Sequence, residues 1–347
     1  MSKSHTVAVY GATGHTGRFV ANELERRGVA VRRIGRRVPA QSISPQDHGR
    51  PAWVSASCDE PDALDRALTA TDAVINCAGP FLDTAPAVVE SALRLGVHYF
   101  DIAAEQRSVR QTLATYSDEA RDKEVVLLPA MAFYGGLADL LAAQLCAGLR
   151  AVDEILIAVA LDYWHPTAGT RRTGERNTAR RLIVSGGHLA PLPASPAPAR
   201  WRFPPPFGDQ PVTGVPLSEI ITISRHIAAR RIESFMNEAP LQDLSSADTP
   251  PPTSVEASGR STQRFVMDVT ASGDGDTKRM AAFGCDIYAV TAPLVVESCM
   301  RVLSQSRRKG GAFAPSELFD PQDFLAALTS DIRVEPISQT RPMEKIR

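Results

Sequence analysis

Three glycines at three-residue spacing, Gly11, Gly14 and Gly17, form the pattern in this sequence that most clearly indicates chemistry. They follow a short β-branched segment at residues 6–10 and precede an amphipathic segment at residues 15–27. In this context the first glycine permits a tight turn, the second lets the backbone approach a pyrophosphate, and the third lets the helix pack on the strand. The phosphates would lie on unpaired amides at the helix N-terminus. We therefore predict a dinucleotide site made by Gly11, Ala12, Thr13, Gly14, His15, Thr16 and Gly17.

The residues after the second predicted strand indicate which dinucleotide binds. An NAD site usually has an acidic residue about 20 residues after the glycines, where it binds the ribose 2′-hydroxyl. This sequence has Gly35, Arg36 and Arg37 there instead. A guanidinium fork suits a 2′-phosphate, so the pattern favours NADP(H), with a solvated arginine cluster as the alternative.

Small and polar residues after two further strands are candidates for contacts with the rest of the cofactor. Asp59 could accept a hydrogen bond from the adenine amino group, or it could cap the next helix. After a strand at residues 72–76, a turn of small residues would let the backbone meet the ribose and nicotinamide, and Pro80 and Phe81 would form a wall of the hydride-transfer pocket. Cys77 has no evident base partner and is interpreted as a small buried thiol. The turn consists of Cys77, Ala78, Gly79, Pro80 and Phe81.

Two tyrosines and two carboxylates near strand ends are candidates for proton transfer. Tyr99 and Tyr134 are the preferred donors, while Asp101 and Glu105 could relay a proton or stabilise an iminium. The carboxylates could instead be ordinary partners of a helix N-terminus. Neither tyrosine has a lysine four residues later, so the Tyr-x-x-x-Lys pair of ordinary carbonyl reduction is absent. Reduction of a C=N or conjugated C=C bond fits better, because such acceptors need less help from an acid.

A basic segment in the second half of the chain is a candidate for substrate binding. Arg172, Arg176 and Arg180 recur every four residues, so on a helix they would share one face, with Trp164 at its entrance. That face could receive a carboxylate, a phosphopantetheine or a coenzyme A thioester, or it could be a solvated basic stripe. The predicted substrate contacts are Phe81, Tyr134, Trp164, Arg172 and Arg176.

Strand and helix patterns alternate through the first 150 residues and would position these groups. The alternation predicts an α/β fold with a doubly wound parallel sheet, in which ligands bind at the carboxyl ends of the strands. The predicted strands lie near residues 6–10, 30–34, 51–55, 72–76, 98–102 and 124–129. The predicted helices lie near residues 15–27, 61–69, 85–95, 105–121 and 136–148.

Beyond residue 150 the pattern changes to strands separated by long, proline-rich connections, which indicates a second domain. The segment 191–216 contains nine prolines and is interpreted as a semi-rigid loop that covers a pocket or makes a subunit contact. Residues 239–260 are interpreted as a mobile surface loop. The predicted elements are strands at 153–161 and 230–236, a hairpin of 264–271 with 278–288, and helices at 171–185 and 291–303.

Composition argues against several classes of protein. The 347 residues suffice for two domains. A formal net charge of −1 gives no excess of positive charge of the kind that binds nucleic acids. The five cysteines lack metal-ligand spacing, which predicts reduced thiols and no metal. We find no run of 18 or more apolar residues, and no room for a signal peptide before the first strand. We therefore expect a soluble, cytoplasmic protein without membrane contact.

Several motifs together resemble the saccharopine dehydrogenase/reductase-like oxidoreductases, a family that includes the trans-acting enoyl reductases. The motifs occupy residues 11–17, 76–81 and 98–105, and the similarity extends through residues 129–139, 286–297 and 314–320. The family usually has an aspartate after the phenylalanine of the fourth motif, whereas this chain has Tyr134.

The resemblance implies an N-terminal NADP-binding Rossmann domain, a C-terminal α+β domain with a mainly antiparallel sheet, and a cleft between them. We place the first domain at residues 1–130, the second at 131–310, and a segment returning to the first domain at 311–347. A homodimer built through the second sheet is also implied. Members reduce imines or activated double bonds, so we expect an NADPH-dependent reductase of a C=N or enoyl C=C substrate. The alternative is a non-catalytic NADP(H)-sensing regulator or a scaffold subunit.

Overall fold

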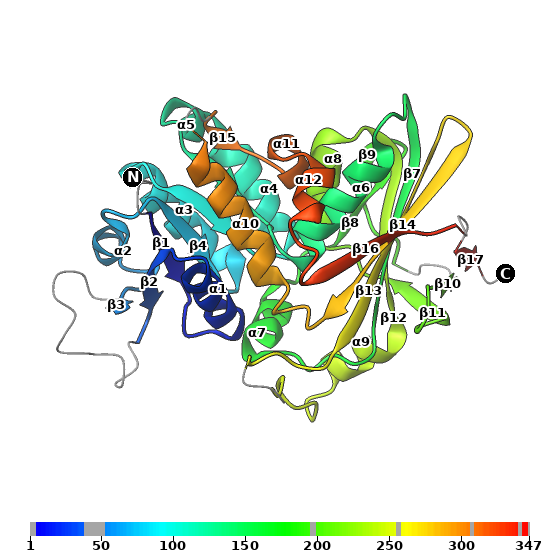
Figure 1. The fold of residues 1–347 in the computed structure, drawn as a ribbon, viewed down its shortest axis with the longest axis horizontal. Helices are drawn as coiled ribbons and strands as arrows, with labels where there is room; N and C mark the ends of the chain where they lie inside the picture. Colours follow the sequence, from blue (N-terminus) through cyan, green and yellow to red (C-terminus); the bar gives the residue numbers. More distant parts are fainter. Residues whose placement is uncertain are drawn as a thin grey trace.

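The computed structural model describes residues 5–37, 53–194, 199–254, 258–305, 309–338 and 342–345, which form two sheets with helices between and around them (Figure 1). The first sheet has the strand order β15-β6-β5-β4-β1-β2-β3, and its neighbouring strands are parallel. The predicted doubly wound parallel sheet is confirmed. Its strands are β1 (Thr6–Tyr10), β2 (Ala30–Gly35), β3 (Trp53–Ser55), β4 (Ala73–Asn76), β5 (His98–Asp101), β6 (Val126–Leu128) and β15 (Gly311–Ala312).

Helices cover both faces of this sheet because its central strands carry apolar side chains on both sides. One face of the sheet packs against α1 (His15–Arg26) and α10 (Thr291–Ser304). The other face packs against α2 (Pro61–Leu68), α3 (Phe81–Leu95), α4 (Gln106–Thr115) and α5 (Ser117–Asp122). The single helix predicted at residues 105–121 is thus two helices, α4 and α5, which meet at Tyr116.

The chain passes from β6 to the second domain through a short π-helix, Phe133–Leu137, which continues as α6 (Ala138–Cys146). Gly135 allows this passage: a Cβ there would lie 2.5 Å from the carbonyl oxygen of Ala130. The close approach requires glycine, and it fixes the backbone that carries Tyr134.

The second sheet is mainly antiparallel, as predicted, with the order β16-β14-β13-β7-β12-β11-β10-β17. Strands β7 and β12 pair in parallel, and the hairpin of β8 and β9 lies beside β12. The strands are β7 (Val152–Leu161), β8 (Leu182–Ser185), β9 (His188–Pro191), β10 (Ala199–Arg202), β11 (Asp209–Gly214), β12 (Ala229–Asn237), β13 (Arg264–Gly273), β14 (Asp276–Cys285), β16 (Ile332–Pro336) and β17 (Met343–Lys345). The helices of this half are α7 (Ala168–Arg176), α8 (Glu219–His226), α9 (Glu238–Ser245), α11 (Pro315–Leu318) and α12 (Pro321–Ala326).

Three predictions for this half of the chain need correction. The helix predicted at residues 171–185 ends at Arg176, and the apolar residues after it form β8, because they pair with β12 and β9. The proline-rich segment 191–216 is not simply a loop, because it contains β10 and β11. The predicted loop 239–260 begins within α9.

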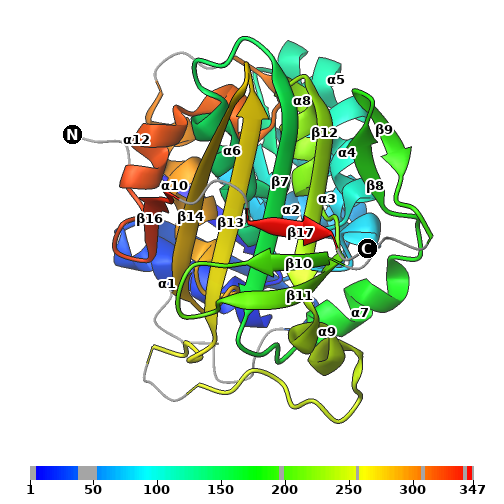
Figure 2. The same cartoon turned by 90° about the vertical axis from the view of Figure 1, so that its right-hand side faces the viewer.

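Burial of Trp201 explains why the proline-rich segment forms strands. The indole is fully buried, and its Nε1 donates a hydrogen bond to Asp268 Oδ2 at 2.8 Å. Figure 2 shows β10, β11 and β17 crossing in front of the long strands, where Trp201 packs with Leu156 and Val266 in one apolar cluster. The free energy of burying this face outweighs the local preference of the prolines.

One apolar core joins the two sheets. Helix α10 packs against α1 and β4, while α6 packs against β13, and their side chains belong to a single cluster. Strand β15 returns to the first sheet beside β6, whereas β16 and β17 join the second sheet. The residue limits given above for the domains stay predictions.

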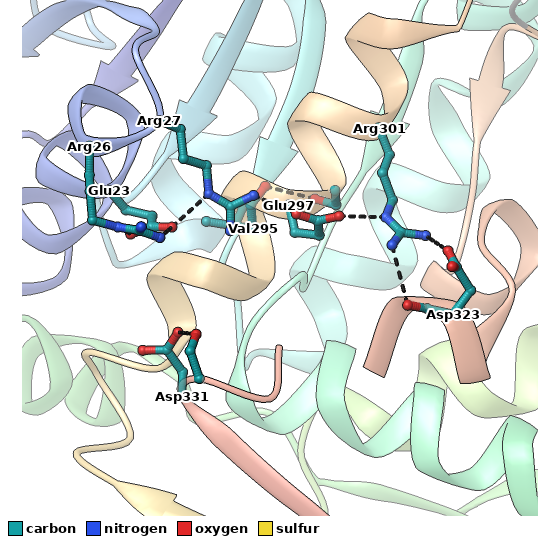
Figure 3. A network of polar contacts seen from close by, with 10 residues as sticks. Glu23, Arg26, Arg27, Val295, Glu297, Arg301, Asp323 and Asp331 are labelled. Atoms are coloured by element: carbon teal, nitrogen blue, oxygen red, sulfur yellow. Dashed lines mark hydrogen bonds and ion pairs between the residues drawn. The ribbon is translucent and has the colours of Figure 1, made fainter. Parts of the chain in front are cut away.

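A series of ion pairs connects α1, α10 and α12 along one edge of this core (Figure 3). Arg27 Nε donates to Glu23 Oε1 at 2.7 Å and also pairs with Glu297. Arg301 Nε donates to Glu297 Oε1 at 2.7 Å, and Arg301 pairs in turn with Asp323. Burial alone would raise the pKa of Glu297, but the hydrogen bonds from Arg301 and Arg27 outweigh it, so the pKa is lowered. The central carboxylate is therefore held ionised between two helices.

The substitution Glu297→Gln is expected to lower the free energy of unfolding at pH 7 by about 1–3 kcal/mol, because two guanidinium groups lose a charged acceptor. The lowered pKa means that ionised Glu297 stabilises the fold above the ordinary glutamate pKa. This contribution is lost as the pH falls through the lower pKa of the folded state. Urea unfolding at several pH values would measure both effects.

The control is Glu335→Gln, which removes only a surface pair with Arg333 and should change stability by less than about 1 kcal/mol. Equal losses in the two variants would contradict a special role for the Glu297 pairs.

Candidate functional site

The turn after β1 packs too closely for any residue other than glycine at two positions. Gly11 has a φ of +83°, and a Cβ there would lie 2.9 Å from the backbone nitrogen of Ala78. A Cβ on Gly17 would lie 2.2 Å from the carbonyl oxygen of Gly11. The turn is therefore pressed against α1 on one side and the loop after β4 on the other, which is the geometry of a dinucleotide-binding turn.

The N-terminus of α1 can receive an anion. The N-cap residue of α1 is Gly14, so no side chain of the described residues caps the helix. The first turn of the helix contains no acidic residue. Unsatisfied amides and the positive end of the helix dipole suit a pyrophosphate, so the turn fits the predicted cofactor. His15 packs edge-on against Phe19 and Tyr288, with ring centroids 5.2 and 5.4 Å away, and burial lowers its pKa. A neutral imidazole leaves the site's charge unchanged.

Arg36 and Arg37 are exposed directly after β2, and Gly35 lies against the turn: a Cβ there would be 3.4 Å from Thr13 Cγ2. Arg33 is already neutralised by Glu25, at 2.7 Å. Within the part of the chain that the structure describes, Arg36 and Arg37 have no such ion pair and remain available for a 2′-phosphate.

Asp59 is exposed beyond β3, where its Oδ2 accepts a hydrogen bond from Ser57 Oγ at 3.2 Å. The alternative role as a helix cap is not observed, because Glu60 occupies the N-cap position of α2. The contact between Asp59 and adenine stays a prediction.

The loop after β4 is fixed by Asn76. Its Oδ1 accepts a hydrogen bond from the backbone nitrogen of Ala78 at 3.0 Å, and its Nδ2 donates to Thr84 Oγ1 at 3.2 Å. Cys77 is half-buried rather than buried as predicted. Burial still raises the pKa of its thiol, which disfavours the reactive thiolate. The peptide bond between Gly79 and Pro80 is cis.

A cavity of about 470 Å³, here called the main cavity, lies between this loop and the second domain. Helix α7 closes over the loop so tightly that a Cβ on Gly79 would lie 2.7 Å from Thr173 Oγ1. The lining includes Thr16, Cys77, Gly79, Phe81 and residues 102–105 from the first domain, and Phe133, Tyr134, Trp164, Thr170, Arg171, Arg181, Leu217 and Tyr288 beyond it. The cavity therefore joins the cofactor turn to the second domain.

Two of the predicted proton-transfer residues, Glu105 and Tyr134, line the main cavity. Glu105 Oε1 accepts a hydrogen bond from the Phe81 amide at 2.9 Å, and Oε2 accepts one from the Ala104 amide at 3.2 Å. Burial raises the pKa of Glu105 to about 7. The Tyr134 hydroxyl is buried without a hydrogen-bond partner among the described residues, and burial raises its pKa.

The other two, Tyr99 and Asp101, lie outside the main cavity lining, in the sheet beneath it. Tyr99 is fully buried, and its hydroxyl donates a hydrogen bond to Asp101 Oδ2 at 2.8 Å. Asp101 Oδ1 accepts hydrogen bonds from the amides of Ala103 and Ala130 at 2.9 and 2.7 Å. These contacts give both side chains a structural role, and their catalytic role is untested.

The hydroxyl of Tyr288, which was not predicted from the sequence, holds together part of the main cavity wall beyond the first domain. The Tyr288 hydroxyl accepts a hydrogen bond from Trp164 Nε1 at 2.9 Å and lies 3.0 Å from Thr170 Oγ1. It therefore fixes the segment that leads into α7. Trp164, predicted to contact substrate, lines the cavity through this arrangement. The only available signal was the position of Tyr288 in the motif at residues 286–297.

The predicted basic stripe is not a single helix face, because α7 ends at Arg176 and Arg180 lies beyond it. Arg176 is exposed and pairs with Asp83 of α3 at 2.9 Å. Neither Arg172 nor Arg176 belongs to the main cavity lining. Arg171 and Arg181 line it instead, and their contact with substrate was not predicted.

A parallel sheet with a glycine-rich turn, a second sheet and a cavity where they meet are features that many two-domain NAD(P)-binding proteins share. Residues 7–128 match the family model of the saccharopine dehydrogenase NADP binding domain. This domain of the chain is therefore similar to the NADP-binding domains of saccharopine dehydrogenases, and its cofactor is NADP(H).

Two individual relatives are similar to part of this chain. A probable mitochondrial saccharopine dehydrogenase-like oxidoreductase of Arabidopsis thaliana is 26% identical over 144 residues, and the match covers 37% of this chain and 32% of that protein. A saccharopine dehydrogenase-like oxidoreductase of Mus musculus is 28% identical over 152 residues, and the match covers 39% of this chain and 35% of that protein. The matched region thus spans about a third of these relatives.

The fold extends the similarity beyond the first domain. The apo saccharopine dehydrogenase (L-Glu forming) of Saccharomyces cerevisiae superposes with a TM-score of 0.65 and 13% sequence identity, over 96% of this chain and 100% of that one. The two proteins therefore share both domains of the fold.

The cytoplasmic location expected from the sequence is contradicted by the names of relatives. The Arabidopsis thaliana protein is called mitochondrial, and a Caenorhabditis elegans relative is called a lipid droplet localized protein. Among the residues that the structure describes, no helix has both the length and the apolar character needed to cross a membrane.

The substitution Arg36→Ala is expected to raise the Kd for NADPH at least about tenfold, because a charged hydrogen bond to the 2′-phosphate contributes about 1.5–3 kcal/mol. The Kd for NADH should change little, because NADH lacks that phosphate. Fluorescence titration of both cofactors would measure the difference, with Arg66→Ala, an exposed arginine of α2, as the control. Equal losses for NADPH and NADH would contradict the assignment.

Proposed function

We propose that this chain is an NADPH-dependent reductase that acts on a C=N or activated C=C bond of a small molecule in the main cavity. The observation that carries the proposal is that two groups able to hold a proton, Tyr134 and Glu105, line the same cavity as the loop of Cys77 and Phe81. When bound at the glycine turn, NADPH supplies the hydride.

The Tyr134 hydroxyl is suited to donate a hydrogen bond to the acceptor. It is buried and has no partner among the described residues, so a bound substrate can provide the missing acceptor atom. Burial raises its pKa, so the hydroxyl stays protonated until substrate binds. The positive charge of Arg181 opposes that rise and would stabilise the phenolate as the proton leaves.

Glu105 is suited to hold and return a proton near neutral pH. Its pKa is raised to about 7 by burial, while the Phe81 and Ala104 amides keep the carboxyl group in one orientation. A group with this pKa exchanges protons readily at physiological pH. Glu105 could therefore return a proton to Tyr134, or it could donate a proton directly to the substrate.

Apolar groups form much of the remaining wall and limit the access of water. Phe81, Ile102, Phe133 and Ile287 line the main cavity beside the two proton-holding groups. An apolar lining that excludes water would strengthen the hydrogen bond from Tyr134 and protect the hydride donor from side reactions.

Incubation of the full chain with NADPH and a panel of imines, enones and enoyl thioesters tests the proposal. We expect loss of the dihydronicotinamide absorbance with at least one acceptor class. Tight NADPH binding without oxidation across the panel would overturn the reductase and favour the NADP(H)-sensing regulator.

The substitution Tyr134→Phe is expected to lower kcat about 100-fold, the usual contribution of a positioned acid, without changing the Kd for NADPH. Steady-state kinetics and cofactor titration would separate these effects. Tyr163→Phe is the control, because Tyr163 lies outside the main cavity lining and its hydroxyl contacts Thr262 at 3.2 Å. An unchanged kcat in Tyr134→Phe would remove that residue as donor.

The pH dependence of kcat tests Glu105 separately. Because its pKa is about 7, the protonated form predominates below pH 7 and is lost above it. If this form supplies the proton, kcat falls as the pH rises through 7. The Glu105→Gln variant should have a lower kcat and lack this step, and persistence of the step would assign it to another group.

A further inference from the structure

A second cavity, here called the arginine pocket, adjoins the main cavity and has a different chemistry. It encloses about 260 Å³, and Arg107, Arg110, Arg180 and Arg181 are among its lining residues. No acidic residue contributes to the lining among the residues that the structure describes. Four guanidinium groups without a carboxylate make a strongly positive enclosure.

The two cavities share part of their walls. Ala104, Asn177, Arg181 and Leu217 line both of them. Ala104 is adjacent to Glu105, and Arg181 is close enough to influence the pKa of Tyr134. A molecule that occupies both cavities could therefore extend from the proposed reaction centre to the guanidinium groups.

The charges of this pocket are not neutralised within the described part of the protein. Arg107 and Arg110 are exposed one turn apart on α4 and have no ion pair there. Arg180 donates only to the Leu192 carbonyl oxygen, at 3.1 Å from Nη2. Arg181 is half-buried, its guanidinium group has no hydrogen-bond partner in the same residues, and burial lowers its pKa.

Glu219 acts on the charge of Arg181 but forms no ion pair with it within the described residues. Its carboxyl is buried, one oxygen accepts a hydrogen bond from the Leu217 amide at 2.8 Å, and burial raises its pKa to about 7. An unpaired, half-buried guanidinium beside a partly protonated acid is costly unless an anion binds it.

The wall of the pocket is preformed. Gln106 Nε2 donates to the carbonyl oxygens of Leu182 and Leu217 at 2.8 and 2.9 Å, and its Oε1 accepts from the Leu182 amide at 2.7 Å. One side chain therefore joins α4 to the start of β8 and to the segment before α8. The arginines are carried by a fixed frame, as a binding site requires.

We propose that the arginine pocket binds a phosphate group on the substrate whose reducible bond lies in the main cavity; this inference rests on the proposed function. A phosphate ester carries up to two negative charges and three acceptor oxygens, so it can pair with several guanidinium forks, whereas one arginine satisfies a carboxylate. The phosphates of NADPH are assigned elsewhere, to the glycine turn and to Arg36 and Arg37, none of which lines the arginine pocket.

Calorimetric titration of the NADP⁺-saturated full chain with pyrophosphate tests the pocket without requiring turnover. We expect binding whose Kd rises at least about tenfold in the double variant Arg107→Ala/Arg110→Ala and stays unchanged in Arg66→Ala. Thermal unfolding would verify that the exposed substitutions leave the fold intact. Absence of binding to the wild type, or equal weakening in Arg66→Ala, would overturn the proposal. Citrate binding as tight as pyrophosphate would overturn its preference for phosphate.

A kinetic comparison separates this proposal from the proposed function. For a phosphate-bearing acceptor, the double variant should have a KM raised at least about tenfold with little change in kcat; for its uncharged analogue, KM should stay the same. Turnover of the uncharged analogue without pyrophosphate binding would overturn the pocket and keep the reductase. Arginine-dependent pyrophosphate binding without turnover of any acceptor would overturn the reductase and support a phosphate site.

Discussion

The buried carboxylate of Asp101 holds the point where the chain passes from the first sheet toward the second. Burial raises its pKa, and the amides of Ala130 and Ala103 and the Tyr99 hydroxyl oppose that rise by donating hydrogen bonds. Each buried donor left without a partner would cost about 1–3 kcal/mol. Glu105 lies shortly after Ala103 in the chain, and Tyr134 lies shortly after Ala130. The placement of both cavity-facing groups therefore depends on one carboxylate that does not itself line the cavity.

Much of the first domain could be predicted because its signals are local. A β-branched strand, three glycines and an amphipathic helix specify their own geometry, and Gly11 and Gly17 are as sterically restricted as their spacing indicated. The same local signals could not assign roles at strand ends. Asp101 and Glu105 are both acids at the end of one strand, yet Asp101 binds backbone amides beneath the cavity while Glu105 lines it. Which way such a side chain faces is decided by partners distant in sequence.

The second domain was harder to predict for the same reason. Tyr288 and Trp164 meet across more than a hundred residues of sequence, and Arg107 and Arg181 line one pocket from distant parts of the chain. The proline-rich segment was predicted as a loop from composition, whereas its strand character depends on burial of Trp201 against β7 and β13. The basic residues near α7 were recognised, but the end of the helix at Arg176 determined which of them face a cavity. Tertiary packing outweighs local preference in each case.

Helix α10 completes one face of the first sheet although it comes from residues 291–304, far from the strands it covers. Strand β15, at residues 311–312, then extends the edge of the same sheet beside β6. During synthesis, the strands within residues 1–130 leave the ribosome well before α10 does. Part of their apolar face therefore stays uncovered until residue 304 has been made and has left the ribosome. An apolar face that stays exposed until residues 291–304 have been synthesised favours aggregation of the nascent chain.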